Sequence, residues 1–228
     1  MKQSAGSAGL AIEHTFVKLA VDKVEVEGIL SVPTDVRGVV LFAHGSGSTH
    51  RSPRNRLVAD VLNEGGLATL LVDLLTPDEQ QVDFQTARLR FDIPFLAERL
   101  TDVADWMKDQ RELHKLPLGL FGASTGAAAA LTTTAARPDV VRAVVSRGGR
   151  PDLAMDALEQ VRAPVLLIVG SADAAVIELN KRAMARMHCP HQLKIVPGAT
   201  HLFEETGTLE QVAKLANDWF GLWMAPSE

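Results

Sequence analysis

A serine lies between two glycines in residues 122–126, which read Gly-Ala-Ser-Thr-Gly. A serine hydroxyl becomes a useful nucleophile when a neighbouring base takes its proton. The pattern follows an apolar run typical of a buried strand and opens an alanine-rich run typical of a helix, which is the context this motif requires. Glycines at such a sharp turn remove side chains that would clash. We therefore predict that Ser124 is a nucleophile; the alternative is a tight turn without chemistry.

A base for this serine is expected at His201, between the last predicted strand and the last predicted helix. The chain has seven histidines, and four of them lie on the first hairpin or before a strand, away from the expected site: His14, His114, His188 and His191. His44 and His50 lie near the expected site but belong to another loop. The alternative for His201 is a purely structural histidine.

The acid that orients the base is expected at Asp173, which follows the apolar run 165–169. A carboxylate in this role accepts a hydrogen bond from the imidazole and stabilises the imidazolium. The chain order Ser124, Asp173, His201 is the order found in α/β hydrolases. Asp152 is the second candidate, although a helix-capping role suits it better.

Backbone N–H groups must also stabilise the negative oxygen that forms in acyl transfer. We expect one donor to be the N–H of Thr125 and the other to be the N–H of Ser46, in the loop His44–Ser48. Losing one such donor costs about 3 to 4 kcal/mol of transition-state stabilisation. The alternatives for this loop are a surface loop or a phosphate-binding loop, but it lacks the lysine and glycine spacing of the latter.

Strand-like apolar runs alternate with longer amphipathic runs, and this alternation predicts an α/β fold with a mostly parallel sheet. Eight strands are expected, the first two as an edge hairpin: 16–21, 24–32, 38–43, 68–72, 116–121, 140–145, 165–169 and 192–196. Helices are expected after Ser52, over about 92–108, after Ser124 and around 209–222, covering both faces of the sheet. Residues 74–91 show no period of their own, and such a long connection is typical of a functional loop.

Composition places the chain among globular proteins, with 228 residues, 46% hydrophobic and 22% charged, and a net charge of −5. The acidic balance gives no reason to expect binding to nucleic acid or to a membrane surface. A single cysteine and the absence of a long apolar run suggest a cytoplasmic protein without a membrane span. We expect a flexible tail over 1–13 and one domain over 14–228, and homodimer formation is left open.

These motifs together resemble the dienelactone hydrolase family of the α/β-hydrolase superfamily, over about residues 15 to 223. The motifs are residues 42–48, 122–126, 146–152, 170–173 and 198–201. The resemblance implies an α/β-hydrolase fold and a Ser-His-Asp triad, with no cofactor. True dienelactone hydrolases use a cysteine nucleophile and bind the substrate carboxylate with arginines, one of them close after the catalytic histidine. This chain has Ser124 as the candidate nucleophile, and no arginine in residues 202–204 after His201.

These departures favour a general carboxylesterase acting on a small-molecule ester. The alternatives are a dienelactone or thioester hydrolase and a ligand receptor without turnover. Similar domains also occur fused to phosphoribosyltransferases. The short stretch after the run 140–145 leaves no room for a lid domain, so an open site for small or flexible esters is expected.

Side chains around the expected site give candidates for substrate contacts. Phe84, Phe91 and Phe95 are predicted either to line an acyl pocket or to belong to the core. Arg147 and Arg150 are predicted either to bind an anionic substrate group or, more in keeping with ordinary proteins, to pair with loop carboxylates. The same question applies to Arg51 and Arg54. Residues 188–191 read His-Cys-Pro-His, but this spacing does not suit a zinc site, so no metal is expected.

Overall fold

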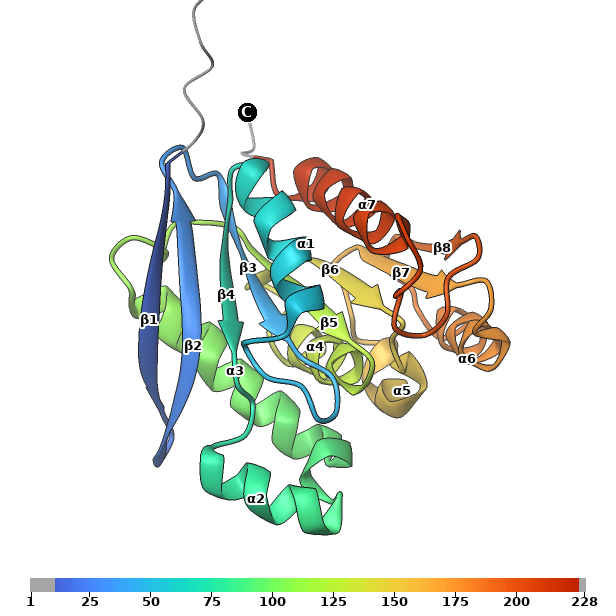
Figure 1. The fold of residues 1–228 in the computed structure, drawn as a ribbon, viewed down its shortest axis with the longest axis horizontal. Helices are drawn as coiled ribbons and strands as arrows, with labels where there is room; N and C mark the ends of the chain where they lie inside the picture. Colours follow the sequence, from blue (N-terminus) through green and yellow to red (C-terminus); the bar gives the residue numbers. More distant parts are fainter. Residues whose placement is uncertain (1–10, 226–228) are drawn as a thin grey trace, which may run out of the picture.

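The computed structural model describes residues 11–225, and within them eight strands form one sheet (Figure 1). The spatial order is β1-β2-β4-β3-β5-β6-β7-β8. The strands are β1 Ile12–Val21, β2 Val24–Pro33, β3 Gly38–Ala43, β4 Leu67–Val72, β5 Leu118–Ala123, β6 Val141–Arg147, β7 Val165–Gly170 and β8 His191–Val196. β1 and β2 pair antiparallel, β2 is antiparallel to β4, and every later neighbouring pair is parallel. The predicted eight-stranded, mostly parallel sheet is confirmed.

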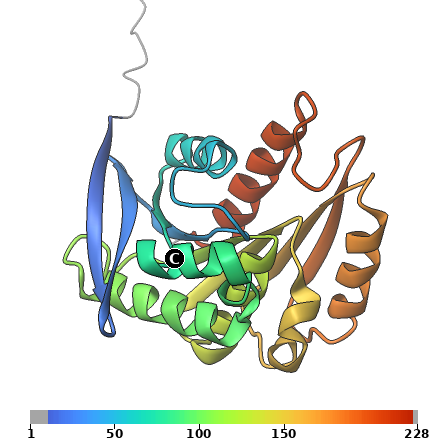
Figure 2. The same ribbon diagram turned by 60° about the horizontal axis from the view of Figure 1, so that its bottom comes forward.

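Helices cover both faces of this sheet (Figure 2). α1 (Pro53–Glu64) and α7 (Thr208–Trp223) pack on one face, while α3 (Ile93–Asp109), α4 (Thr125–Ala136) and α6 (Ala174–Met184) pack on the other. The central strands β3, β4, β5 and β7 are buried along their whole length, as expected for strands with helices on both sides.

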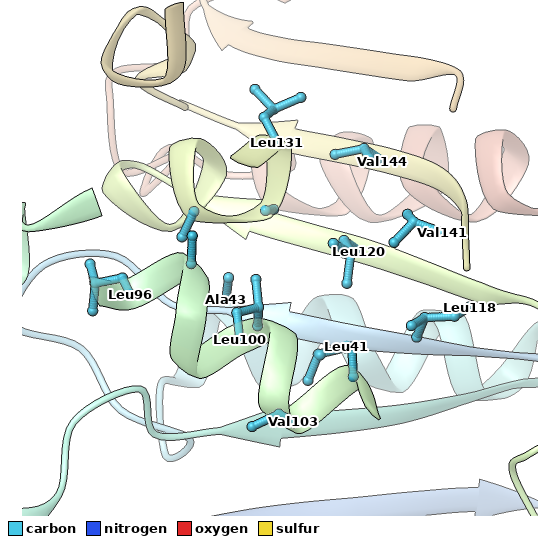
Figure 3. Packing of buried hydrophobic residues seen from close by; sticks show 14 of the residues in the cluster. Leu41, Ala43, Leu96, Leu100, Val103, Leu118, Leu120, Leu131, Val141 and Val144 are labelled. Atoms are coloured by element: carbon cyan, nitrogen blue, oxygen red, sulfur yellow. The ribbon is translucent and has the colours of Figure 1, made fainter. Parts of the chain in front are cut away.

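Local sequence explains why α1 and α4 form where they do. The Ser52 side chain accepts a hydrogen bond from the N–H of Asn55, and Pro53 occupies the first turn of α1, as predicted. α4 presents small residues to the sheet, and Ala127 to Ala130 are completely buried. Figure 3 shows how α3 and α4 contribute leucine and valine side chains to the layer against β3, β5 and β6.

The connection 74–91 is more ordered than its sequence suggested. It contains α2 (Pro77–Thr86) and a 3-10 turn, η1 (Leu89–Phe91). The side chain of Thr76 caps α2 and Glu79 bonds back to the Thr76 N–H, which forms a capping box. Asp83 is the one buried residue of α2, so the helix carries no apolar stripe, and its sequence shows no helical period. The available signal was Thr-Pro followed by an acidic residue.

The remaining connections are short. Residues 148–164, between β6 and β7, form η2 (Pro151–Ala154) and α5 (Met155–Leu158), with no inserted domain. β1 begins at Ile12, so residues 12 and 13 of the expected tail over 1–13 belong to a strand. Residues 1–10 lie outside the described part. No helix between residues 11 and 225 is long and apolar enough to cross a membrane.

Candidate active site

Ser124 occupies the turn between β5 and α4 with φ 50° and ψ −120°, a conformation that non-glycine residues rarely adopt. Two glycines make this turn sterically possible. A Cβ at Gly126 would overlap the carbonyl oxygens of Ala43 and His44, and one at Gly122 would overlap the backbone of Ala127. Strain of this kind costs about 1 to 3 kcal/mol and is typical of functional sites.

The structure brings His201 and Asp173 to this serine. The Oδ2 atom of Asp173 lies 2.7 Å from Nδ1 of His201, and Nε2 of His201 lies 3.4 Å from Oγ of Ser124. An ionised carboxylate can only accept, so Nδ1 carries the proton and Nε2 is free to accept from the serine hydroxyl. The Ser–His contact is long, as is common in unliganded sites. His201 is partly exposed, whereas Asp173 is mostly buried.

Loops at the carboxyl ends of β7 and β8 hold the acid and the base in place. The N–H of Ala172 donates to the carbonyl of Ala199 at 2.9 Å, which ties the two loops together. The residue before the base, Thr200, donates its N–H to the Glu205 carboxylate at 3.1 Å. The buried ring of Phe203, at φ 56°, anchors the same loop in the core.

A cavity of about 150 Å³ is lined by Gly45 and Thr125, which adjoin the nucleophile, whereas Ser124, Asp173 and His201 are not among its lining residues. Ser46 and Thr125, the two predicted oxyanion donors, both belong to its lining. Gly45, another lining residue, packs against the serine turn, since an added Cβ there would lie 3.0 Å from Cβ of Ser124. The cavity therefore lies next to the serine turn, and the role of the Ser46 and Thr125 N–H groups as oxyanion donors stays a prediction.

The three phenylalanines have different environments. Phe84 lines the cavity and is 86% exposed. Phe91 is outside the lining and is half-exposed, so the structure does not place it in an acyl pocket. Phe95 packs against the core and under the guanidinium of Arg99, whose Cζ lies 4.9 Å from the ring centroid.

The two predicted substrate arginines also differ. Arg150 forms a two-pronged pair with Asp152, with both contacts at 2.8 Å, which is the expected structural ion pair. Nδ1 of His201 is bonded to Asp173 and Asp152 is bonded to Arg150, so the hydrogen bonds favour Asp173 over the second candidate for the acid. Asp152 lies inside η2, after Pro151, and does not cap that helix, so the predicted capping role is wrong.

The expected pairing of Arg147 with a loop carboxylate is wrong. Its side chain is 8% exposed, and its Nε and Nη1 atoms have no hydrogen-bond partner among the described residues. Burial, together with the nearby charge of Arg54, lowers the pKa of Arg147 to about 10. Arg147 lies outside the cavity lining. Arg54 itself pairs with Glu204 at 3.1 Å, and Nε of Arg51 lies 3.4 Å from Nε2 of His50.

Polar residues that the sequence analysis did not single out complete the surroundings. Arg90 and Gln80 line the cavity, and Arg90 is held by Asp83 through contacts of 2.6 to 3.1 Å. Asp73, at the carboxyl end of β4, pairs with His50. Its place directly after a buried strand was the signal that could have found it. Within residues 11–225 no group of three metal-ligating side chains comes together.

The strand order, the strained serine turn and the loops that carry Asp173 and His201 define an α/β hydrolase. The profile of the dienelactone hydrolase family matches residues 26–222, and the chain belongs to this family. The predicted membership is confirmed.

Solved structures agree with this assignment. The chain is 51% identical to a dienelactone hydrolase from Anabaena variabilis, with a TM-score of 0.92, covering 93% of this chain and 99% of that one. Est1E from Butyrivibrio proteoclasticus shares the fold at 17% identity, with a TM-score of 0.76, covering 90% and 97%.

Curated relatives carry a different name. Two Mycobacterium tuberculosis proteins, provisionally named phosphoribosyl transferases, are 58% identical over 204 residues. The match covers 90% of this chain but only 45% of either relative, so the chain spans less than half of their length.

Proposed function

We propose that this chain is a serine hydrolase that cleaves small carboxylic esters through an acyl-enzyme. The observation that carries the proposal is the alignment of Asp173, His201 and Ser124, with contacts of 2.7 and 3.4 Å. Family membership and the esterase-like fold support a hydrolase, and the geometry of these three side chains supports the serine mechanism.

In this mechanism Oγ of Ser124 attacks the ester carbonyl carbon while Nε2 of His201 takes the hydroxyl proton. The carbonyl oxygen becomes an oxyanion and accepts hydrogen bonds from the N–H groups of Ser46 and Thr125. The carboxylate of Asp173 stabilises the imidazolium. His201 then returns the proton to the leaving alkoxide, and the alcohol departs. Water repeats these steps on the acyl-enzyme and releases the carboxylic acid.

The walls of the cavity suggest which esters fit. Leu74, Leu75, Leu96 and Phe84 supply apolar surface, and the volume of about 150 Å³ suits a short acyl or alkyl group. The absence of an inserted domain over 148–164 leaves the serine side open. Dienelactones and thioesters are chemically close alternatives, because both present a carbonyl carbon to the same nucleophile.

The name of the mycobacterial relatives does not favour a transferase function for this chain. The dienelactone hydrolase profile covers residues 26–222, so most of the 90% of the chain that aligns with them carries the hydrolase pattern. A receptor without turnover is also disfavoured, since it would need neither an aligned base nor a strained serine.

A fluorophosphonate probe and a short p-nitrophenyl ester test the proposal. The probe should label Ser124, and Ser124→Ala should lose both labelling and hydrolysis. Ser46→Ala is the matched control, because it removes a neighbouring hydroxyl but keeps the backbone N–H, and it should retain activity. Labelling that persists in Ser124→Ala would refute the assignment.

A further inference from the structure

The loop between β3 and α1, residues 44–52, carries the N–H of Ser46, and it is hydrogen-bonded at His44 and at His50 to the residues that follow β4. At its start, the N–H of Leu74 donates to Nε2 of His44 at 3.0 Å. Near its end, Asp73 accepts twice from His50: the backbone N–H lies 2.6 Å from Oδ1, and Nδ1 lies 2.9 Å from Oδ2.

Two hydrogen bonds within the loop shape its backbone. The N–H of Ser48 donates to the carbonyl of Gly45 at 3.1 Å, and the N–H of Ser52 donates to Thr49 at 3.0 Å. Turns of this kind shape a loop locally but do not fix its position against the sheet. The start of the loop also packs against the serine turn, at Gly45 and at the carbonyl of His44. The hydrogen bonds with Asp73 and Leu74 fix the loop against the residues that follow β4.

The anchor at Asp73 is buried. His50 and Asp73 are 4% and 7% exposed, and the ring of Phe16 packs edge-on against His50 at 6.1 Å. Hydrogen bonds to a carboxylate shielded from water are strong and directional. Neither residue contacts Ser124 or His201 through a described hydrogen bond, and neither lines the cavity.

We propose that Asp73 and His50 are positioning residues for the oxyanion hole, and that they hold the N–H of Ser46 in register with the N–H of Thr125. This inference rests on the proposed esterase function. Oxyanion donors must lie within about 0.5 Å of the productive geometry. Misplacing a catalytic group by about 1 Å can cost about 10²-fold in rate. Removing the hydrogen bonds between His50 and Asp73 should therefore lower kcat and leave substrate affinity nearly unchanged.

Substitutions separate the two hydrogen bonds. His50→Ala removes the imidazole contact but keeps the backbone N–H donating to Asp73. Asp73→Ala removes both contacts. Asp73→Asn keeps an oxygen that accepts from the His50 N–H, so it is the conservative variant expected to rescue activity.

Asn63→Ala is the matched control. Its buried side chain links α1 to the amino-terminal half of β4, donating to the carbonyl of Leu67 at 2.8 Å and to Thr69 at 3.1 Å. Its removal should lower the melting temperature without moving the loop.

The experiment measures kcat and KM for p-nitrophenyl acetate, inhibition by a trifluoromethyl ketone that forms an oxyanion, and hydrogen exchange of residues 44–52. Asp73→Ala should lower kcat about 10- to 100-fold and change KM less than about 3-fold. It should weaken inhibition by the ketone by a factor close to the loss in kcat. The loss in kcat should be smaller in His50→Ala and smallest in Asp73→Asn. Exchange in the loop should rise in Asp73→Ala and stay unchanged in Asn63→Ala.

The proposal is overturned if folded Asp73→Ala keeps the parent kcat and inhibition, or if Asn63→Ala loses as much activity at an equal drop in melting temperature. Should Asp73→Ala fail to fold, His50→Ala decides, and a parent-like kcat for it overturns the proposal. A parent protein that hydrolyses no ester refutes the proposed function itself, which distinguishes the two failures.

Discussion

The backbone N–H of Ser124 donates to the carbonyl oxygen of Arg147 at 3.2 Å, so the strained serine turn rests on the end of β6 beside a buried guanidinium. That guanidinium has Arg54 nearby and no carboxylate partner among residues 11–225. Structural arginines in the interior are normally paired, because an unpaired buried charge destabilises the folded state.

Arg147→Met should therefore stabilise the protein. Burial lowers the pKa of Arg147 to about 10, so the folded state disfavours the charged form by about 3 kcal/mol at neutral pH. This penalty is complete below about pH 10 and declines as the pH rises above that value. Urea unfolding at pH 7 should show a gain of about 1 to 3 kcal/mol.

Arg150→Met, which breaks the partly exposed pair with Asp152, is the control and should change the free energy of unfolding by at most about 1 kcal/mol. A lower stability for Arg147→Met would mean that the guanidinium stabilises the folded protein in solution.

Asp173→Asn should lower kcat by about 10³- to 10⁴-fold with little change in KM, because an amide at this position favours the wrong tautomer of His201. Steady-state hydrolysis of a p-nitrophenyl ester measures the effect. Asp152→Asn, at the carboxylate that pairs with Arg150, should retain the parent kcat. Equal losses in the two variants would contradict the assignment of the acid.

Phe84→Ala should raise KM for esters with longer or aromatic acyl groups while leaving acetate esters nearly unaffected. The ring is 86% exposed and lines the cavity, so its removal takes apolar surface from the substrate and little from the core. The melting temperature should stay close to that of the parent. Phe91→Ala, at a half-exposed ring outside the cavity, is the matched control, and a similar KM change there would argue against a specific acyl wall.

His44 should make stability depend on pH. Burial lowers its pKa below the ordinary value of 6.5, and its Nε2 accepts from the N–H of Leu74 only while the ring is neutral. The unfolded chain then binds this proton first as the pH falls, so the stability is fully present above about pH 6.5 and declines below it.

Melting temperatures between pH 7 and pH 5 test this prediction. The decline should be shallower in His44→Gln than in the parent, whereas His114→Gln, at an exposed histidine, should follow the parent. Parallel curves for all three proteins would exclude a contribution from His44.

Much of this architecture could be predicted from the sequence because its signals are local. Apolar runs, glycine spacing around Ser124 and the Ser52-Pro53 helix start each depend on residues close together in the chain. Chain order and strand ends also placed Ser124, Asp173 and His201 at one edge of a parallel sheet, where the structure brings them into hydrogen-bonding reach. Their catalytic role stays a prediction.

Tertiary structure decided the pairings between distant residues. Asp73 and His50 are 23 residues apart, and Arg54 and Glu204 are 150 apart. Which carboxylate meets which cation depends on how strands and loops pack, and no local pattern carries that information. The same reason left Arg147 without its expected partner. The helix α2 had a local capping signal but no apolar stripe, and its contacts with α3 through Glu79 and Arg99 are visible only in the tertiary structure.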